Sequence, residues 1–192
     1  MRESGILMHI TSLPTPYGIG TMGKDAYAFV DFLVRAGQRY WQILPLTPTG
    51  YGDSPYQSLG ACAGNHYLID LDRLADEGLL KKEEIQDIPW GSNPARVDFG
   101  AMYAHRMNVL RQAFQRFAPD EAYETFVEQN RSWLEDYALF TALKDTLGGK
   151  PWLEWPEALR LRKADALAEK RRELSEEIRL QFFAQYEFDK QW

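Results

Sequence analysis

Aromatic and short polar side chains lie together in one segment of the sequence, Tyr51-Gly52-Asp53-Ser54-Pro55-Tyr56-Gln57. A sugar ring presents an apolar face of C–H groups flanked by hydroxyls, so a flat aromatic ring with small polar groups beside it binds sugars well. The two tyrosines supply the first kind of group, and Asp53 and Ser54 supply the second. The segment therefore suggests a carbohydrate-binding loop. The residues alone leave an alternative open, in which Gly-Asp-Ser-Pro is a turn and Asp53 binds nearby backbone N–H groups.

The same loop lacks the acids needed to break a glycosidic bond with retention. That reaction requires two carboxyl groups roughly 5 Å apart, one as nucleophile and one as acid and then base. Asp53 is the only acid in the loop, while Asp70, Asp72 and Asp98 stand where helix caps or turn residues are expected. We predict no catalytic residue in the chain.

Other chemistries find little support in the sequence. Gly18-Ile19-Gly20-Thr21-Met22-Gly23 matches the glycine pattern of dinucleotide sites. However, residues 11–17 separate it from the preceding apolar run, and Leu44-Pro45-Leu46 stands where an acidic ribose ligand is expected. We expect a glycine-rich loop that leads into a helix.

The metal-ligating residue types are scattered. His9, His66 and His105 lack ligand spacing, and Cys62 is the only cysteine. We predict no metal and no cofactor. Because Cys62 lies among Ala61, Ala63 and Gly64, we expect a small buried side chain that is not a nucleophile.

The elements that position the loop read as a strand, a helix and a second strand. Short apolar runs occupy residues 5–10 and 40–46 and predict buried strands, and helical spacing from Ala26 to Ala36 ends at Gly37. Two strands joined in this way are parallel. The loop over residues 47–65 follows the second strand, at the carboxyl end of the sheet, where α/β barrels bind their substrates.

The remainder of the chain has helical spacing. We predict helices over residues 106–117, 121–147 and 164–192, with breaks at Pro119, at Gly148 and Gly149, and around Pro151 and Pro156. The predicted organisation is a first β-α-β part of a barrel with the substrate loop over residues 1–70. A helical insertion over residues 71–161 and a helix returning to the barrel over residues 162–192 follow.

Aromatic side chains are crowded in the last predicted helix, which lacks a stop signal. They are Phe182, Phe183, Tyr186, Phe188 and Trp192. Two strands do not close a sheet, and a (β/α)₈ barrel takes roughly 250 residues. We therefore expect that further sequence covers these rings and that the chain alone self-associates.

Composition narrows the class of protein and its partners. The chain has 192 residues, 45% of them hydrophobic and 26% charged, with a formal net charge of −6. This balance is that of a globular protein, and the negative charge disfavours nucleic acid and anionic membranes as partners. No run is long enough to span a membrane, and the start lacks the apolar region of a signal peptide. We predict a cytoplasmic protein.

Several of these segments together resemble the amylomaltases, the bacterial 4-α-glucanotransferases that are called disproportionating enzymes in plants. The similar segments are GILMHITSLP at residues 5–14, YGIG at 17–20, YWQILPL at 40–46, TGYGDSPYQ at 49–57, WLEDYALF at 133–140 and QW at 191–192. The resemblance covers the whole chain. One departure is His66, which stands between Asn65 and Tyr67 where the family commonly has proline.

The resemblance implies a fold, an activity and a set of binding residues. The fold is the beginning of a (β/α)₈ barrel with a mostly helical inserted subdomain, incomplete in this chain. The activity is transfer of α-1,4-glucan segments between maltooligosaccharides by retaining double displacement, with the catalytic carboxylates beyond Trp192. Tyr56 matches a ring that stacks on glucose and Ser54 a substrate hydrogen-bonding position. Tyr51 and Tyr103 match a secondary glucan-binding site, although Tyr103 by itself would be read as core packing.

Two other functions remain open at this point. The chain would be a non-catalytic α-glucan-binding module if it bound maltooligosaccharide without turnover. It would be part of a hydrolase of the α-amylase superfamily if maltotriose gave glucose without longer products.

Overall fold

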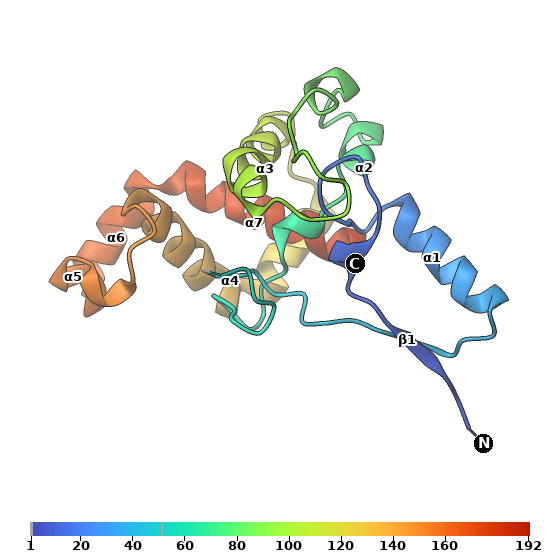
Figure 1. Ribbon diagram of the computed structural model, residues 1–192. Coiled ribbons are helices and arrows are strands. Elements are labelled where there is room, and N and C mark those ends of the chain that lie inside the picture. The colour runs from blue at the N-terminus through green and yellow to red at the C-terminus, as the bar shows by residue number, and fades with distance from the viewer. Residues whose placement is uncertain (1, 51) are drawn as a thin grey trace. The chain divides into compact units, whose positions relative to one another are not determined.

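The fold consists mainly of helices, with one small parallel sheet (Figure 1). The computed structural model describes residues 2–50 and 52–192. Strand β1 (Gly5–Leu7) pairs in parallel with β2 (Tyr40–Gln42), with Gly5 opposite Tyr40 and Leu7 opposite Gln42. Helix α1 (Lys24–Arg35) connects them, and Gly37 follows it with a φ of +69°. The predicted strand, helix and parallel strand are confirmed, although both strands are shorter than the apolar runs. The prediction that the strands are buried is wrong, because among the described residues they pair only with each other and their side chains are mostly exposed.

Further along the chain come α2 (Leu71–Asp76), α3 (Phe99–Phe114), α4 (Glu121–Thr146) and α5 (Glu157–Arg160), followed by α6 (Ala164–Glu173) and α7 (Ser175–Gln191). The described residues also form four short 3₁₀ turns. These are η1 (Ile10–Ser12), which precedes α1, and η2 (His66–Leu68), η3 (Lys82–Glu84) and η4 (Trp152–Glu154). Within residues 2–50 and 52–192, no helix is both long and apolar enough to cross a membrane.

Two predicted helices differ from those observed. Helix α3 begins seven positions before the predicted start, because Asp98 caps it by accepting a hydrogen bond from the Ala101 N–H at 3.0 Å. The single helix predicted over residues 164–192 is two helices. Leu174, with a φ of −101° and a ψ of 24°, ends α6 before α7 begins.

The chain forms two compact units. The first contains residues 1–118 and 187–192, and the second contains residues 119–186. The predicted organisation into residues 1–70, 71–161 and 162–192 concerns a complete barrel and stays a prediction.

One core cluster of the first unit packs against the sheet and α1. Ile10, Leu13, Met22 and Leu68 are its buried centre. Phe29 of α1 meets Trp41 of β2 edge to face, with ring centroids 4.9 Å apart, and the Trp41 indole donates to the Met8 carbonyl at 2.7 Å. These contacts fix the direction in which the chain leaves β2.

The last turn of α7 belongs to this same unit. The Gln191 side chain accepts a hydrogen bond from the Asp70 N–H at 2.7 Å and donates to the Asp70 carbonyl at 3.3 Å. Phe188 packs against the core described above, and its ring lies over Gly64, where an added Cβ would be 2.0 Å from Phe188 Cδ1. The final turn therefore holds the backbone on both sides of η2.

Burial corrects two expectations from the sequence. Cys62 is exposed rather than buried. Gly64, two positions later, lies against the ring of Phe188, which accounts for the glycine there. The aromatic side chains of α7 are largely covered within the chain, since Phe183 and Tyr186 are buried, while Trp192 is exposed.

Candidate glucan-binding site

The segment after β2 forms a closed loop. Thr49 and Ser58 pair as an isolated antiparallel bridge, and the Gly50 N–H donates to the Gln57 carbonyl at 3.0 Å. Inside the loop, the Asp53 N–H donates to the Gly50 carbonyl at 3.1 Å. Asp53 has a φ of +56°, a left-handed conformation that aspartate tolerates better than most residues. The predicted loop is thus closed at its base by backbone pairing and contains a turn at Asp53, and no backbone N–H among the described contacts donates to the Asp53 side chain.

A hydrogen bond joins this loop to helix α3. The Tyr103 hydroxyl donates to Asp53 Oδ1. Partial burial raises the pKa of Tyr103 to about 12, and the hydrogen bond with Asp53 and the negative charge of that carboxylate act in the same direction. Tyr103 therefore stays protonated at neutral pH and remains a donor. Its ring is 54% exposed, so it is not the core residue that the helical pattern alone suggested.

Tyr56 presents its ring to solvent beside this connection. It is 75% exposed, and its backbone N–H donates to Ser54 Oγ at 3.3 Å. Ser54 therefore helps to fix the backbone that carries the ring, and its hydroxyl keeps capacity for a further partner. Asp53, Ser54 and Tyr56 lie in one loop, and Tyr103 joins them from α3. Tyr51, the other residue expected at a secondary site, lies outside the described residues.

A buried arginine of α3 anchors this helix to the backbone around η2. Arg106 is fully buried, and its Nη2 donates to the carbonyls of Tyr67, at 2.7 Å, and Ile69. Burial lowers the pKa of Arg106 to about 10, which leaves the guanidinium charged at neutral pH. The Tyr67 ring in turn meets the Tyr103 ring edge to face at 6.0 Å. Arg106 and Tyr67 thereby set the position from which Tyr103 reaches Asp53. Neither role could be predicted from the spacing or types of the neighbouring residues.

Of the other acids expected to act as caps or turn residues, Asp70 and Asp98 are helix caps, whereas Asp72 lies in the first turn of α2 and caps nothing. Asp70 accepts from the Arg73 N–H at 3.0 Å as the cap of α2 and also from Thr21 Oγ1 at 2.6 Å. Asp72 accepts from the Tyr17 hydroxyl at 2.6 Å. Asp53 is therefore the acid that the candidate site uses.

Three observations bear on the glycine and histidine motifs. Cβ atoms added to Gly20 and Gly23 would lie 1.8 Å from the Ile10 carbonyl oxygen and 2.0 Å from Asp70 Oδ2, so these glycines permit close protein packing. Among the residues that the structure describes, no three or more His, Cys, Asp or Glu side chains gather in a group that could hold a metal. Asn65 caps η2 through a hydrogen bond from the Tyr67 N–H at 3.0 Å, so the turn forms with histidine at position 66.

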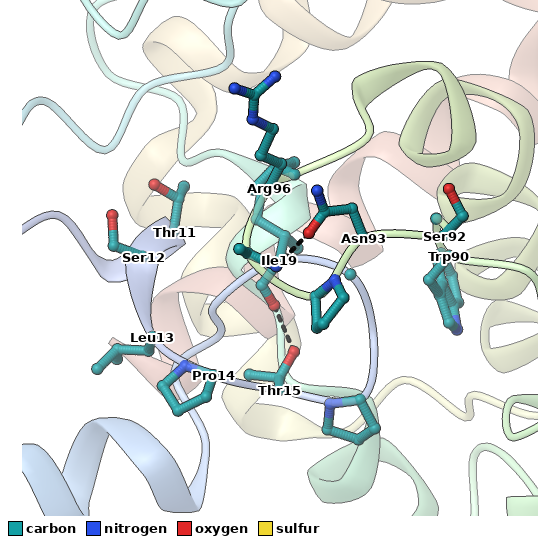
Figure 2. A pocket seen from close by; sticks show the side chains of 16 residues that line it. Thr11, Ser12, Leu13, Pro14, Thr15, Ile19, Trp90, Ser92, Asn93 and Arg96 are labelled. Atoms are coloured by element: carbon teal, nitrogen blue, oxygen red, sulfur yellow. Dashed lines mark hydrogen bonds between the residues drawn. The ribbon is translucent and has the colours of Figure 1, made fainter.

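A hollow of about 570 Å³ lies in another part of the first unit (Figure 2). Two segments line it: residues 11–19, except Tyr17, and residues 90–97. Figure 2 shows Thr15 turned toward Ile19, and the Thr15 hydroxyl donates to the Ile19 carbonyl at 2.5 Å. None of the predicted site residues lines it. The cluster of Gly, Ser, Asn and Pro at residues 91–94 was the signal that could have indicated a second exposed loop.

Comparison with known proteins reveals close similarity over the whole chain. A family model described as 4-alpha-glucanotransferase matches residues 8–192. The chain is 50% identical to a 4-alpha-glucanotransferase of Thermus thermophilus and 47% identical to one of Streptococcus pneumoniae. In both comparisons all of this chain is aligned, with 38% and 39% of the relative. An amylomaltase of Streptococcus agalactiae, solved in complex with acarbose, superposes with a TM-score of 0.96 at 47% identity, over all of this chain and 40% of that one. The chain thus spans about two fifths of the length of these proteins.

Proposed function

The chain belongs to the 4-alpha-glucanotransferase family, and we propose that it supplies glucan-binding residues to an enzyme that transfers α-1,4-glucan segments between maltooligosaccharides. The observation that carries this proposal is an exposed tyrosine on an ordered loop. Tyr56 is 75% exposed, yet the loop below it is closed by the bridge between Thr49 and Ser58. A ring held in this way can stack on a sugar with little loss of conformational freedom on binding.

Each of the predicted site residues has a place in this proposal. Tyr56 stacks on a glucose ring, and Ser54 and Asp53 bind its hydroxyls. Tyr103 and Tyr51 form a secondary contact with the same or another glucan chain. The hydrogen bond from Tyr103 to Asp53 couples the two contacts, because it fixes the loop against α3.

Asp53 does not fit the part of a nucleophile or an acid/base. Retaining transfer uses two carboxyl groups roughly 5 Å apart, and one of them must carry a proton at working pH. Asp53 is the only acid in the loop, and its Oδ1 already accepts a hydrogen bond from the Tyr103 hydroxyl. We therefore assign Asp53 to binding and positioning, and assign the bond-breaking step to carboxylates other than those of this loop.

The proposal extends to the fold around the loop. Strands β1 and β2 act as the first two strands of a (β/α)₈ barrel, with the loop at its carboxyl face. Apolar side chains of this sheet and of α1 are exposed, among them Ile6, Leu7, Val30, Phe32 and Tyr40. Further strands and helices of a barrel would cover such a surface, which supports this placement.

Product analysis with maltotriose tests the function on the full-length protein. A glucanotransferase gives glucose together with maltopentaose and longer chains, because a glucan hydroxyl rather than water resolves the covalent intermediate. Glucose and maltose without longer products would indicate a hydrolase instead. Binding of maltoheptaose without any product would indicate a glucan-binding module, and either result would overturn the proposal.

A further inference from the structure

The second unit, residues 119–186, has a hollow of about 340 Å³ of its own. Its lining comes from α4, η4, α5 and α6, and these helices are labelled in Figure 1. The residues that line it are Asp136, Leu139, Phe140, Leu143, Trp152, Trp155, Leu159, Arg160, Arg162 and Leu167. None of them takes part in the loop site described above.

The floor of this hollow is apolar and aromatic. Phe140 and Trp155 lie with ring centroids 5.3 Å apart and planes inclined by 30°, and the Trp155 indole N–H donates to the Lys150 carbonyl at 3.0 Å. These contacts fix Trp155. Trp152, in η4, lines the same hollow but is 50% exposed. A half-exposed indole beside a fixed aromatic floor offers a flat apolar surface to a ligand.

The rim is charged and ordered. Arg162 Nη2 donates to Asp136 Oδ2 at 2.7 Å, and Arg171 Nη2 donates to Asp136 Oδ1 at 3.3 Å. Arg162 reaches Asp136 from a backbone φ of +52°, a conformation that costs energy in a residue other than glycine and is common near ligand sites. Both a carboxylate acceptor and guanidinium donors therefore stand at the edge of the apolar floor.

We propose that this hollow is a further α-glucan-binding site, separate from the Tyr56 loop, in which the Trp152 indole stacks on a glucose ring. This proposal rests on the proposed function for its ligand class. The Asp136–Arg162 pair would donate to and accept from the hydroxyls of the same sugar. An apolar side chain from a partner protein or a second copy would instead remove water from that ion pair without replacing its hydrogen bonds. A polyhydroxylated chain meets both the floor and the rim.

Nuclear magnetic resonance of the indole N–H groups tests the site in the full-length protein. The Trp152 signal is assigned by its loss in Trp152→Phe. Addition of maltoheptaose should shift the Trp152 signal in a saturable way. Retention in native gels containing glycogen should weaken about tenfold in Trp152→Ala, which corresponds to about 1.4 kcal/mol. Leu153→Ala is the matched control, because Leu153 is the adjacent residue, is 66% exposed and does not line the hollow.

Several results would overturn this inference. A Trp152 signal that maltoheptaose leaves unmoved would do so, as would equal retention of Trp152→Ala and Leu153→Ala. An indole shielded from acrylamide quenching without glucan would show that other parts of the protein fill the hollow. Self-association lost in Trp152→Ala would indicate a second copy there. Formation of longer products from maltotriose by the unmodified protein tests the proposed function separately, so the two failures are distinguishable.

Discussion

Tyr103 and Asp53, 50 positions apart in the sequence, are joined by a hydrogen bond that ties helix α3 to the loop after β2. The donor is a hydroxyl whose pKa is raised to about 12, so the bond persists across the physiological range of pH. The loop that carries Tyr56 is consequently positioned by a helix as well as by its own backbone.

Removing the Tyr56 ring should reduce activity without reducing stability. In the full-length protein, Tyr56→Ala is expected to lower kcat/KM by about five- to a hundredfold, on the scale of about 1–3 kcal/mol for lost aromatic contact. Tyr56→Phe keeps the ring and should lose far less. Because the ring is 75% exposed, the melting temperature should stay the same. A lower melting temperature with unchanged kcat/KM would show that Tyr56 packs the loop and does not bind sugar.

The pKa of Tyr103 should fall when Asp53 loses its charge. Burial, the hydrogen bond and the Asp53 charge all raise this pKa, and Asp53→Asn removes the last and weakens the second. Carbon resonances of labelled tyrosine rings, followed during alkaline titration, measure the change, with Tyr103→Phe giving the assignment. An unchanged pKa would show that Asp53 and Tyr103 are not in contact in solution.

The same group makes stability depend on alkaline pH. A tyrosine whose pKa is higher in the folded state than the ordinary value of 10 stabilises the fold fully below pH 10. This contribution is lost as the pH rises through about 12. Urea unfolding at a series of pH values should therefore show a decline in this range for the unmodified chain that is smaller in Tyr103→Phe. Identical declines would assign the effect to other tyrosines.

Arg106 should be required for stability more than for chemistry. Arg106→Ala would leave the carbonyls of Tyr67 and Ile69 without their donor and open a cavity beneath α3. We expect a loss of about 2–4 kcal/mol in the free energy of unfolding, measured with urea. Arg96→Ala, at an exposed position, is the control and should change stability by less than about 0.5 kcal/mol. Equal effects of the two substitutions would contradict the role assigned to Arg106.

Gly64→Ala should destabilise the first unit because the Phe188 ring occupies the place of its Cβ. The added carbon would lie 2.0 Å from Phe188 Cδ1, so the ring must move. A cost of about 1–3 kcal/mol is expected, and Phe188→Leu in the same chain should recover part of it. Gly100→Ala provides a control, since its nearest contact is at 3.2 Å. A Gly64→Ala chain as stable as the original would show that this contact is loose.

The sequence predicted the elements whose signals are local. The helix from Ala26 to Ala36 with its stop at Gly37, and the caps at Asp70 and Asp98, depend on neighbouring residues and were recovered. The break at Leu174 was not, because leucine favours helix and its backbone conformation carries no mark in the sequence. Cys62 was misjudged for a related reason. Gly64, one of the small residues beside it, is small because it lies against the Phe188 ring, over a hundred positions away in the sequence.

For the candidate site, the sequence identified residues but not their connections. Asp53, Ser54 and Tyr56 are adjacent, and their types indicated sugar binding without any structure. The bond between Asp53 and Tyr103, and the support from Arg106 through Tyr67, depend on how α3 packs. The spacing of apolar residues in the sequence does not indicate how α3 packs. The roles of Tyr56, Ser54, Asp53 and Tyr103 in binding remain predictions for the experiments above.

The paired hydrogen bonds between Gln191 and the backbone of Asp70 also bear on the order of folding. They close a loop of 121 positions, and residues so distant in sequence meet late, since the entropy of closing the loop opposes them. During synthesis the ribosome releases residues 1–118 well before Gln191 exists. The first unit therefore cannot complete its contacts until the second unit has been made. Until then, Asp70 and the neighbourhood of Gly64 remain uncovered by Gln191 and Phe188.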